Sequence, residues 1–138
     1  MPLNHKSVIA LDVGTVRIGV AVASLAARFP RPLQTLTNDE NFTDKLLTII
    51  ENNQVERVIV GLPRGLDGQD TGQTEFVRAF VLQLASSVKL PMLFQDEALS
   101  SRRAKEELEL RGLDYDKGDV DALAAALILE DYLRDSEV

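Results

Sequence analysis

Apolar runs and amphipathic segments alternate along the chain, and their order predicts the fold. Continuous apolar runs are typical of strands buried on both faces. Strands are expected over Ser7–Val13, Arg17–Ser24, Leu33–Leu36, Val55–Gly61 and Leu90–Gln95. Apolar residues at helical spacing predict helices between and after these strands. The helices are expected from Asn38 or Asp39 to Asn53, from Thr74 to Ser87, from a cap at Ser100 or Ser101 to Arg111 with Gly112 as the stop, and from Gly118 to Leu133.

This order of elements predicts an α/β fold with a mixed five-stranded sheet. The first three strands are close in sequence, so they are expected to pair antiparallel. Each of the last two strands follows a helix, as a parallel crossover requires. We expect helices on both faces of the sheet, and the 138 residues fit a single domain, 1–138.

The composition limits the chemistry that the chain can perform. There is no cysteine, and the single histidine, His5, lies in a polar N-terminal segment. Thiolate metal sites, histidine-based zinc sites and Ser-His triads are therefore not expected. A catalytic metal would need oxygen ligands, which favours Mg²⁺ or Mn²⁺.

Membrane association is not expected either. The longest apolar run, Ala122–Leu129, is far shorter than the roughly 20 residues of a membrane span. The N-terminal segment also lacks the apolar region of a signal peptide. A cytoplasmic protein without a membrane partner is the expectation.

The net charge of −7 counts against avid, non-specific binding of nucleic acid, because such binding is driven by basic surface. It leaves room for a local basic groove. Basic residues do cluster in two places, at Arg28 and Arg31 and at Arg102, Arg103 and Lys105.

Three carboxylates are predicted to meet at one edge of the sheet. Asp12 lies near the carboxyl end of the first strand, and Asp96 and Glu97 lie at the carboxyl end of the fifth, where sites gather in parallel sheets. Asp121 lies on the apolar face of the last helix, beside small alanines that allow a close approach. Converging carboxylates need a divalent cation to stay ionised, and such a cage suits two-metal phosphoryl transfer.

Each of these acids also has a structural interpretation. Asp12 precedes a glycine and can form a turn, and Asp96-Glu97 can cap the following helix. Asp119 is expected to cap the last helix, where the helix dipole also favours Asp121. The glycine-rich segment Pro63–Thr74 is expected to be a mobile, substrate-facing flap or, alternatively, a passive surface loop.

Four motifs add a family resemblance. The phrases ALDVGTVRIGVAVA, VIVGLPRGLDGQ, FQDEALSS and DVDALAAALILEDYL occur in this order between Val8 and Leu133. Together they resemble the YqgF family, also called RuvX, whose members are described as Holliday-junction-resolvase-like or as candidate pre-16S rRNA nucleases.

The resemblance implies an RNase H-like fold and a nuclease that depends on Mg²⁺ or Mn²⁺. The implied substrate is the 5′ end of pre-16S rRNA, with branched DNA as an alternative. The family's catalytic, metal-binding carboxylates fall on Asp12, Glu97 and Asp121. Arg78 matches a phosphate-contacting arginine, and we expect Arg17, Gly14 and Thr15 to bind substrate as well. A monomer and a homodimer both remain open.

Some positions depart from the family pattern. Basic residues that are usual in the family are replaced around the expected site, and a loop asparagine is replaced by Gly65. The replaced basic positions are Val16, Ala98 and Asp119. Fewer positive charges predict a weaker hold on a polyanion, whereas the carboxylate set is complete.

Two other functions compete with the nuclease. The Asp-Val-Gly-Thr turn resembles the phosphate-binding hairpin of actin-like kinases, but those proteins close two such domains over ATP, and 138 residues supply one. A non-catalytic module that binds RNA or protein is the second alternative, favoured by the acidic balance.

Overall fold

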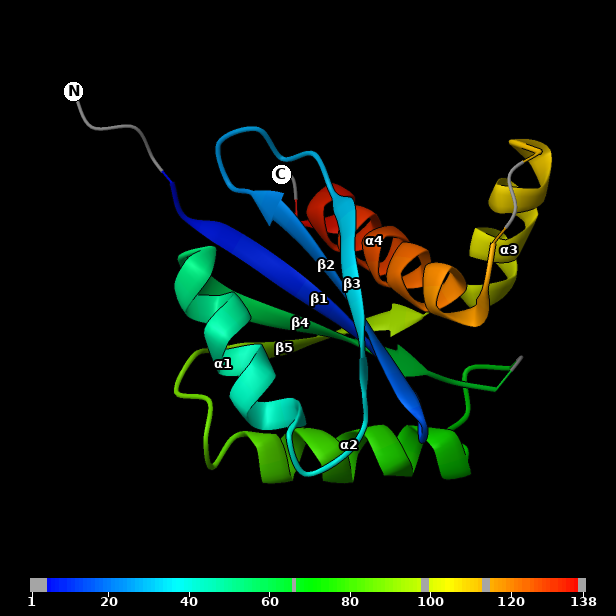
Figure 1. Cartoon of the computed structure of the whole chain (residues 1–138). Coiled ribbons are helices and arrows are strands. Elements are labelled where there is room, and N and C mark those ends of the chain that lie inside the picture. The colour runs from blue at the N-terminus through cyan, green and yellow to red at the C-terminus, as the bar shows by residue number, and fades with distance from the viewer. Residues whose placement is uncertain (1–4, 66, 98–99, 113–114, 137–138) are drawn as a thin grey trace.

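A five-stranded mixed sheet forms the centre of the computed structural model, which describes residues 5–65, 67–97, 100–112 and 115–136. The strands are β1 (Ser7–Val13), β2 (Arg17–Ser24), β3 (Arg31–Thr37), β4 (Val55–Pro63) and β5 (Met92–Glu97). They lie in the order β3-β2-β1-β4-β5, as Figure 1 shows. The pairs β1–β2 and β2–β3 are antiparallel, and β1–β4 and β4–β5 are parallel, so the predicted sheet is confirmed.

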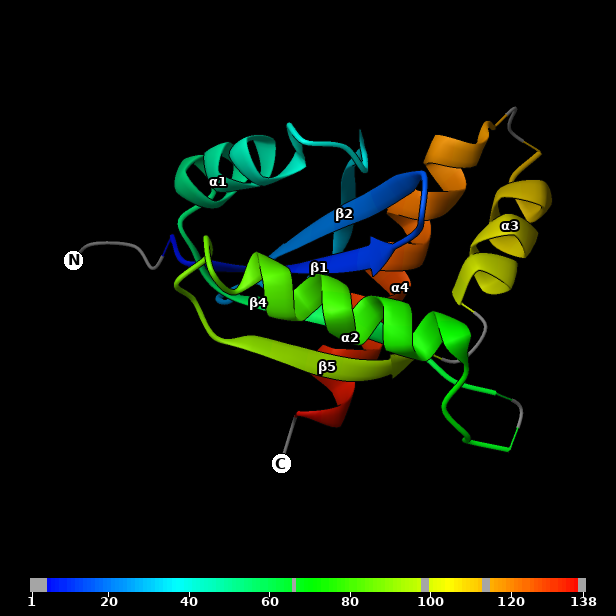
Figure 2. The ribbon, with the colours of Figure 1, turned by 90° about the horizontal axis from the view of Figure 1, so that it is seen from below.

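Helices cover both faces of this sheet, as predicted (Figure 2). They are α1 (Phe42–Asn52), α2 (Gly72–Leu84), α3 (Ser100–Leu110) and α4 (Lys117–Asp135). Two apolar clusters define the layers: one joins the sheet to α1 and α2, and the other joins it to α4 and Ala104 of α3. Helix α3 packs against α4, on the outside of the molecule (Figure 1). Among the described residues, no helix has the length and apolarity needed to cross a membrane.

The alternation of side chains along β1 fixes the direction of Asp12. Ile9 and Leu11 belong to the cluster under α1 and α2, and Val8 and Ala10 belong to the cluster under α4. Successive strand residues point to opposite faces, so Asp12 shares the face of Val8 and Ala10. The carboxylate therefore lies on the side of the sheet that α4 covers.

Helix α4 approaches the sheet closely at Gly19. A Cβ atom on Gly19 would lie 2.0 Å from the backbone oxygen of Asp121 and 2.9 Å from the nitrogen of Ala122. No residue with a side chain fits such a contact without moving the helix. Since Gly19 pairs with Asp12 across the β1–β2 ladder, this contact seats the start of α4 beside Asp12.

Several element boundaries differ from the prediction, although every predicted element exists. Strand β3 begins at Arg31 rather than Leu33, because an edge strand with a register shift accommodates Pro32. The fifth strand begins later than predicted and reaches Glu97. Strand β4 runs on to Pro63, and α1 begins later than its predicted caps imply, after Asn41. The next helix begins earlier than predicted and is capped by Thr71.

The ends of the last two helices also differ. Ser100 is the first residue of α3, so neither Ser100 nor Ser101 is the N-cap that the sequence predicted. The position before Ser100 lies outside the described residues. Its predicted stop is confirmed, because Gly112 has φ +67° just after the helix.

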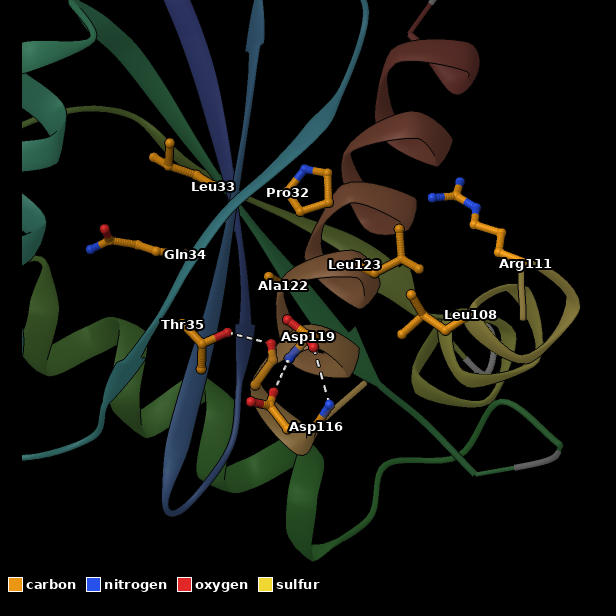
Figure 3. A pocket seen from close by; sticks show the side chains of 11 residues that line it. Pro32, Leu33, Gln34, Thr35, Leu108, Arg111, Asp116, Asp119, Ala122 and Leu123 are labelled. Carbon is orange, nitrogen blue, oxygen red and sulfur yellow. Dashed lines mark hydrogen bonds between the residues drawn. The ribbon is translucent and has the colours of Figure 1, made fainter. Parts of the chain in front are cut away.

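The predicted cap of α4 at Asp119 is wrong: Asp116 is the N-cap, and Asp119 is the third helical residue. The Asp119 amide donates to Asp116 Oδ1 at 2.8 Å, and the Asp116 amide donates to Asp119 Oδ2 at 3.0 Å (Figure 3). This reciprocal capping box uses both carboxylates. The hydroxyl of Thr35 adds a bond to the Gly118 carbonyl at 2.6 Å, which fixes the first turn of α4 against β3.

Candidate active site

Asp12, Glu97 and Asp121 line one hollow of about 250 Å³ at the carboxyl ends of β1, β4 and β5. Arg17 and Gly14 line it as well. The remaining lining residues are Val13, Pro63 and Gln73. The structure thus brings together three carboxylates that are far apart in the sequence, together with two of the four residues expected to bind substrate.

A second glycine lets Glu97 reach the hollow from the edge strand. The pairing of Leu11 with Val60 puts Gly61 of β4 next to Asp12, on the same face of the sheet. A Cβ atom on Gly61 would lie 3.3 Å from Glu97 Oε2 and 2.5 Å from Cδ1 of Ile128. The Glu97 side chain therefore extends over the bare backbone of β4 toward β1.

Burial raises the pKa of both central carboxylic acids. The pKa of Asp12 lies well above its usual range, first because the group is buried and then because Glu97 and Asp121 are negatively charged neighbours. Burial also raises the pKa of Glu97. Among the described residues, no hydrogen-bond donor reaches either carboxylate. The ionised forms of these groups therefore lack a compensating partner.

Asp121 differs from the other two acids because it has a partner. Arg17 Nε donates to Asp121 Oδ2 at 2.6 Å, and both residues line the hollow. The Asp121 side chain is 17% exposed and the Arg17 side chain 37% exposed, so water screens this ion pair only in part. The guanidinium supplies the positive charge on one side of an otherwise acidic site.

The donor set fits a hard divalent cation by its chemistry. Three carboxylates supply the oxygen ligands that Mg²⁺ and Mn²⁺ prefer, and two of them have no other partner in the described structure. Within residues 5–65, 67–97, 100–112 and 115–136, however, no three acidic or histidine side chains are spaced as ligands of one ion. The Arg17–Asp121 bond is the contact that a cation would have to replace.

The other residues expected to bind substrate have separate positions. The Gly14 amide donates to the Arg17 carbonyl at 2.9 Å, so it is engaged within the β1–β2 hairpin. Thr15 is exposed at the tip of that hairpin and does not line the hollow. Arg78 lies on α2, where its guanidinium is 5.9 Å from the ring centre of Phe94, also outside the hollow.

A charged cluster that the sequence patterns did not predict lies beside the hollow. Arg64 follows Pro63 directly and contacts two carboxylates, Asp70 Oδ1 at 3.0 Å and Asp96 Oδ1 at 3.2 Å. Arg78 Nη2 approaches the second oxygen of Asp70 at 3.5 Å. The signal was present in the sequence, because an arginine directly after an apolar strand lies at the sheet edge where sites form.

A larger hollow, of about 520 Å³, lies between β3, α3 and the start of α4 (Figure 3). Its wall is largely apolar, with Pro32, Leu108 and Leu123 among the lining residues. Its two acids, Asp116 and Asp119, bond each other's backbone amides in the capping box. The candidate catalytic residues therefore line the smaller hollow and not the larger one.

The fold matches those of solved resolvase structures. A solved structure of T. thermophilus RuvC with a Holliday junction substrate matches 96% of this chain and 97% of its own, at a TM-score of 0.55 and 18% identity. A fowlpox virus resolvase bound to Holliday junction DNA matches 94% of this chain and 97% of its own, at a TM-score of 0.53 and 11% identity. The chain has the RNase H-like fold of these resolvases.

Sequence comparison identifies the family within this class. A family model described as RuvX, Holliday junction resolvase, matches residues 6–135. A protein of Maridesulfovibrio salexigens is 41% identical over 91% of this chain and 96% of its own length. One of Chloroflexus aurantiacus is 36% identical over 95% of this chain and 88% of its own length. Both are named as candidate pre-16S rRNA nucleases. The chain belongs to the RuvX family, and the predicted family resemblance is confirmed.

Proposed function

We propose that this protein is a divalent-metal-dependent endonuclease that hydrolyses phosphodiester bonds at the 5′ end of pre-16S rRNA. One observation carries the proposal: Asp12, Glu97 and Asp121 converge on one hollow, and two of them have no compensating partner among the described residues. The names of the curated relatives supply the substrate. In this role the protein acts in the cytoplasm, with nucleic acid as its partner.

The residues have distinct roles in this proposal. Asp12, Glu97 and Asp121 hold the cation, which when bound would supply the Lewis acidity for attack of water on the phosphate. Arg17 leaves Asp121 and turns its guanidinium toward a phosphate oxygen of the substrate. Gly14 keeps the hairpin tight, so that the backbone of the strand to be cut can approach the carboxylates.

Branched DNA is a second candidate substrate. The family model is described as a Holliday junction resolvase, and the fold is shared with resolvases solved on junction DNA. The two substrates are compared by offering the protein a structured pre-16S leader RNA and a four-way DNA junction under the same conditions. Cleavage of the junction alone would overturn the RNA assignment.

Cleavage tests the proposal directly. We expect wild type to cut the leader RNA with Mg²⁺ or Mn²⁺ and Glu97→Gln to lose at least about 100-fold in rate, since a metal ligand is removed. Glu130→Gln is the matched control, because Glu130 is an exposed residue of α4 and should cut like wild type. Absence of cleavage by wild type, or equal cleavage by Glu97→Gln, would contradict the nuclease and favour a non-catalytic binding module.

Calorimetric titration with Mn²⁺ tests the role of the Arg17–Asp121 bond. Asp121→Ala removes an oxygen ligand and should weaken Mn²⁺ binding by about tenfold or more. Arg17→Gln removes the competing positive charge and frees Asp121, so it should strengthen binding by about threefold to tenfold. If both variants bind Mn²⁺ as wild type does, Asp121 is no metal ligand.

A further inference from the structure

A pair of arginines beside the carboxylate hollow converges on one anionic position. Arg64 leaves the end of β4, and Arg78 comes from α2. Between them lies the carboxylate of Asp70, with Oδ1 3.0 Å from Arg64 Nη1 and Oδ2 3.5 Å from Arg78 Nη2. Each oxygen thus faces a different guanidinium. Two guanidiniums directed at one anion are the arrangement with which proteins bind phosphate.

Other contacts hold both arginines in place without using all of their donors. The Arg78 guanidinium lies over Phe94, 5.9 Å from the ring centre, and its buried Nε has no hydrogen-bond partner among the described residues. Arg64 Nε is held at 3.2 Å from Asp96 Oδ1. Phe94, Asp96 and Glu75, whose Oε1 is 4.0 Å from Arg78 Nε, thus also contact the arginines, and Asp70 reaches them from the loop that precedes α2.

The position of this cluster follows from its neighbours in the sequence. Pro63, which precedes Arg64, lines the hollow, and Asp96, which anchors Arg64, precedes the hollow's Glu97. Arg64 and Asp96 are thus each one residue away from a residue that lines the hollow, and a substrate strand that continues past Pro63 would meet the cluster. The two arginines also supply positive charge next to a site that holds three carboxylates.

We propose that Arg64 and Arg78 form a phosphate-binding subsite on the path of the substrate strand, and that Asp70 occupies this subsite in the free protein. A backbone phosphate of the nucleic acid replaces the Asp70 carboxylate between the two guanidiniums. The proposal rests on the proposed nuclease function for the identity of the ligand. On this proposal Asp70 must leave the two guanidiniums before the strand binds.

The exposure of the cluster favours such an exchange. The side chains of Arg64, Asp70 and Arg78 are 33%, 44% and 40% exposed, so water screens their ion pairs and each adds little to stability. A nucleic-acid phosphate brings in addition the entropy of released counterions. Replacing Asp70 by phosphate therefore costs little and gains binding.

Binding of RNA without metal tests this subsite separately from cleavage. Fluorescence anisotropy would follow a labelled pre-16S leader RNA in EDTA, at several salt concentrations, for wild type and for variants with confirmed melting curves. Arg64→Gln and Arg78→Gln should each weaken binding by about threefold to tenfold and lower the slope of log Kd against log salt by about 0.7. Asp70→Asn should strengthen binding by about threefold to tenfold.

The matched control is Asp67→Asn, an exposed residue of the same loop whose replacement changes the net charge equally. It should change binding less than about twofold. In an Arg64→Gln background, Asp70→Asn should lose most of its effect, because the contact that it releases is already gone. Equal effects of Asp70→Asn and Asp67→Asn, or unchanged binding by Arg64→Gln, would overturn the proposal.

The two proposals fail in different ways. If wild type cuts RNA but the arginine variants bind as it does, the nuclease stands and the subsite is wrong. If the binding pattern appears but no metal supports cleavage, the subsite stands and the protein is a binding module. If the arginine and Asp70 variants change the binding of the DNA junction but not of the RNA, the subsite stands and its ligand is DNA.

Discussion

Replacing Asp12 with asparagine should abolish cleavage and make the protein more stable. Activity should fall by at least about 1000-fold, because the central carboxylate of the site is lost. At pH 7 the free energy of unfolding should rise, since burial and two negatively charged neighbours destabilise the ionised carboxylate of Asp12 in the native state. In the native state this carboxylate is buried near two other acids, and no hydrogen-bond donor of the described residues reaches it.

The sign of the pH dependence follows from the raised pKa of Asp12. A carboxylic acid that binds its proton more tightly in the native state stabilises the fold below its unfolded pKa. That stabilisation is lost as pH rises through the native pKa. The advantage of Asp12→Asn over wild type should therefore be largest at neutral pH and shrink as the pH falls toward the ordinary range of aspartic acid.

Urea unfolding at several pH values, with Asp67→Asn as the exposed control, measures this effect. The control should stay within about 0.5 kcal/mol of wild type. Added Mn²⁺ should raise the Tm of wild type and leave that of Asp12→Asn nearly unchanged, because a ligand stabilises only the state that binds it. Equal stability of Asp12→Asn and wild type at every pH would mean that the carboxylate is solvated in the native state.

Gly19→Ala should destabilise the protein by about 2–4 kcal/mol and reduce cleavage strongly. The added Cβ would lie 2.0 Å from the Asp121 carbonyl oxygen. The backbone fixes the positions of both atoms, so no side-chain rotation relieves the clash. Helix α4 must move outward, and Asp121 moves with it. Urea unfolding measures the first effect, and the cleavage assay and Mn²⁺ titration measure the second.

Gly72→Ala is the matched control for this substitution. A Cβ atom on Gly72, the first residue of α2, would meet nothing within 4 Å. Alanine there should be neutral or stabilising by up to about 1 kcal/mol, through the smaller entropy of the unfolded chain. If Gly19→Ala unfolds at the same urea concentration as Gly72→Ala, α4 does not depend on the close contact at Gly19.

The sheet and its helices could be predicted from the sequence because their signals are local. The apolar runs around Asp12 and Gly61 predicted buried strands, and the small alanines of the last helix predicted a close approach to the sheet. The boundaries were less certain, since propensity changes little over one or two residues. Strand β5 reaches Glu97 because β4 offers a pairing partner as far as Pro63, which no local pattern reveals.

The side-chain partners within the site could not be predicted in the same way. Arg17 and Asp121 are 104 positions apart, and their bond depends on the close contact between α4 and Gly19. The sequence predicts the wrong aspartate as the N-cap of α4, because Asp116 and Asp119 are both residues that can cap a helix. Only the backbone geometry shows which of them does so. The Arg64–Asp70 contact depends likewise on the path of the loop before α2.

The docking of α4 against β2 also determines when the carboxylate set is completed during synthesis of the protein. Asp12 lies in the first strand, whereas Asp121 arrives with the last helix, which also covers one face of the sheet. A chain folds from its N-terminus as it leaves the ribosome. Until α4 has emerged and docked, a nascent chain has Asp12 and Glu97 without their third carboxylate. Under the proposed nuclease function, a partly made copy would lack the complete carboxylate set and could not cut nucleic acid until α4 has docked.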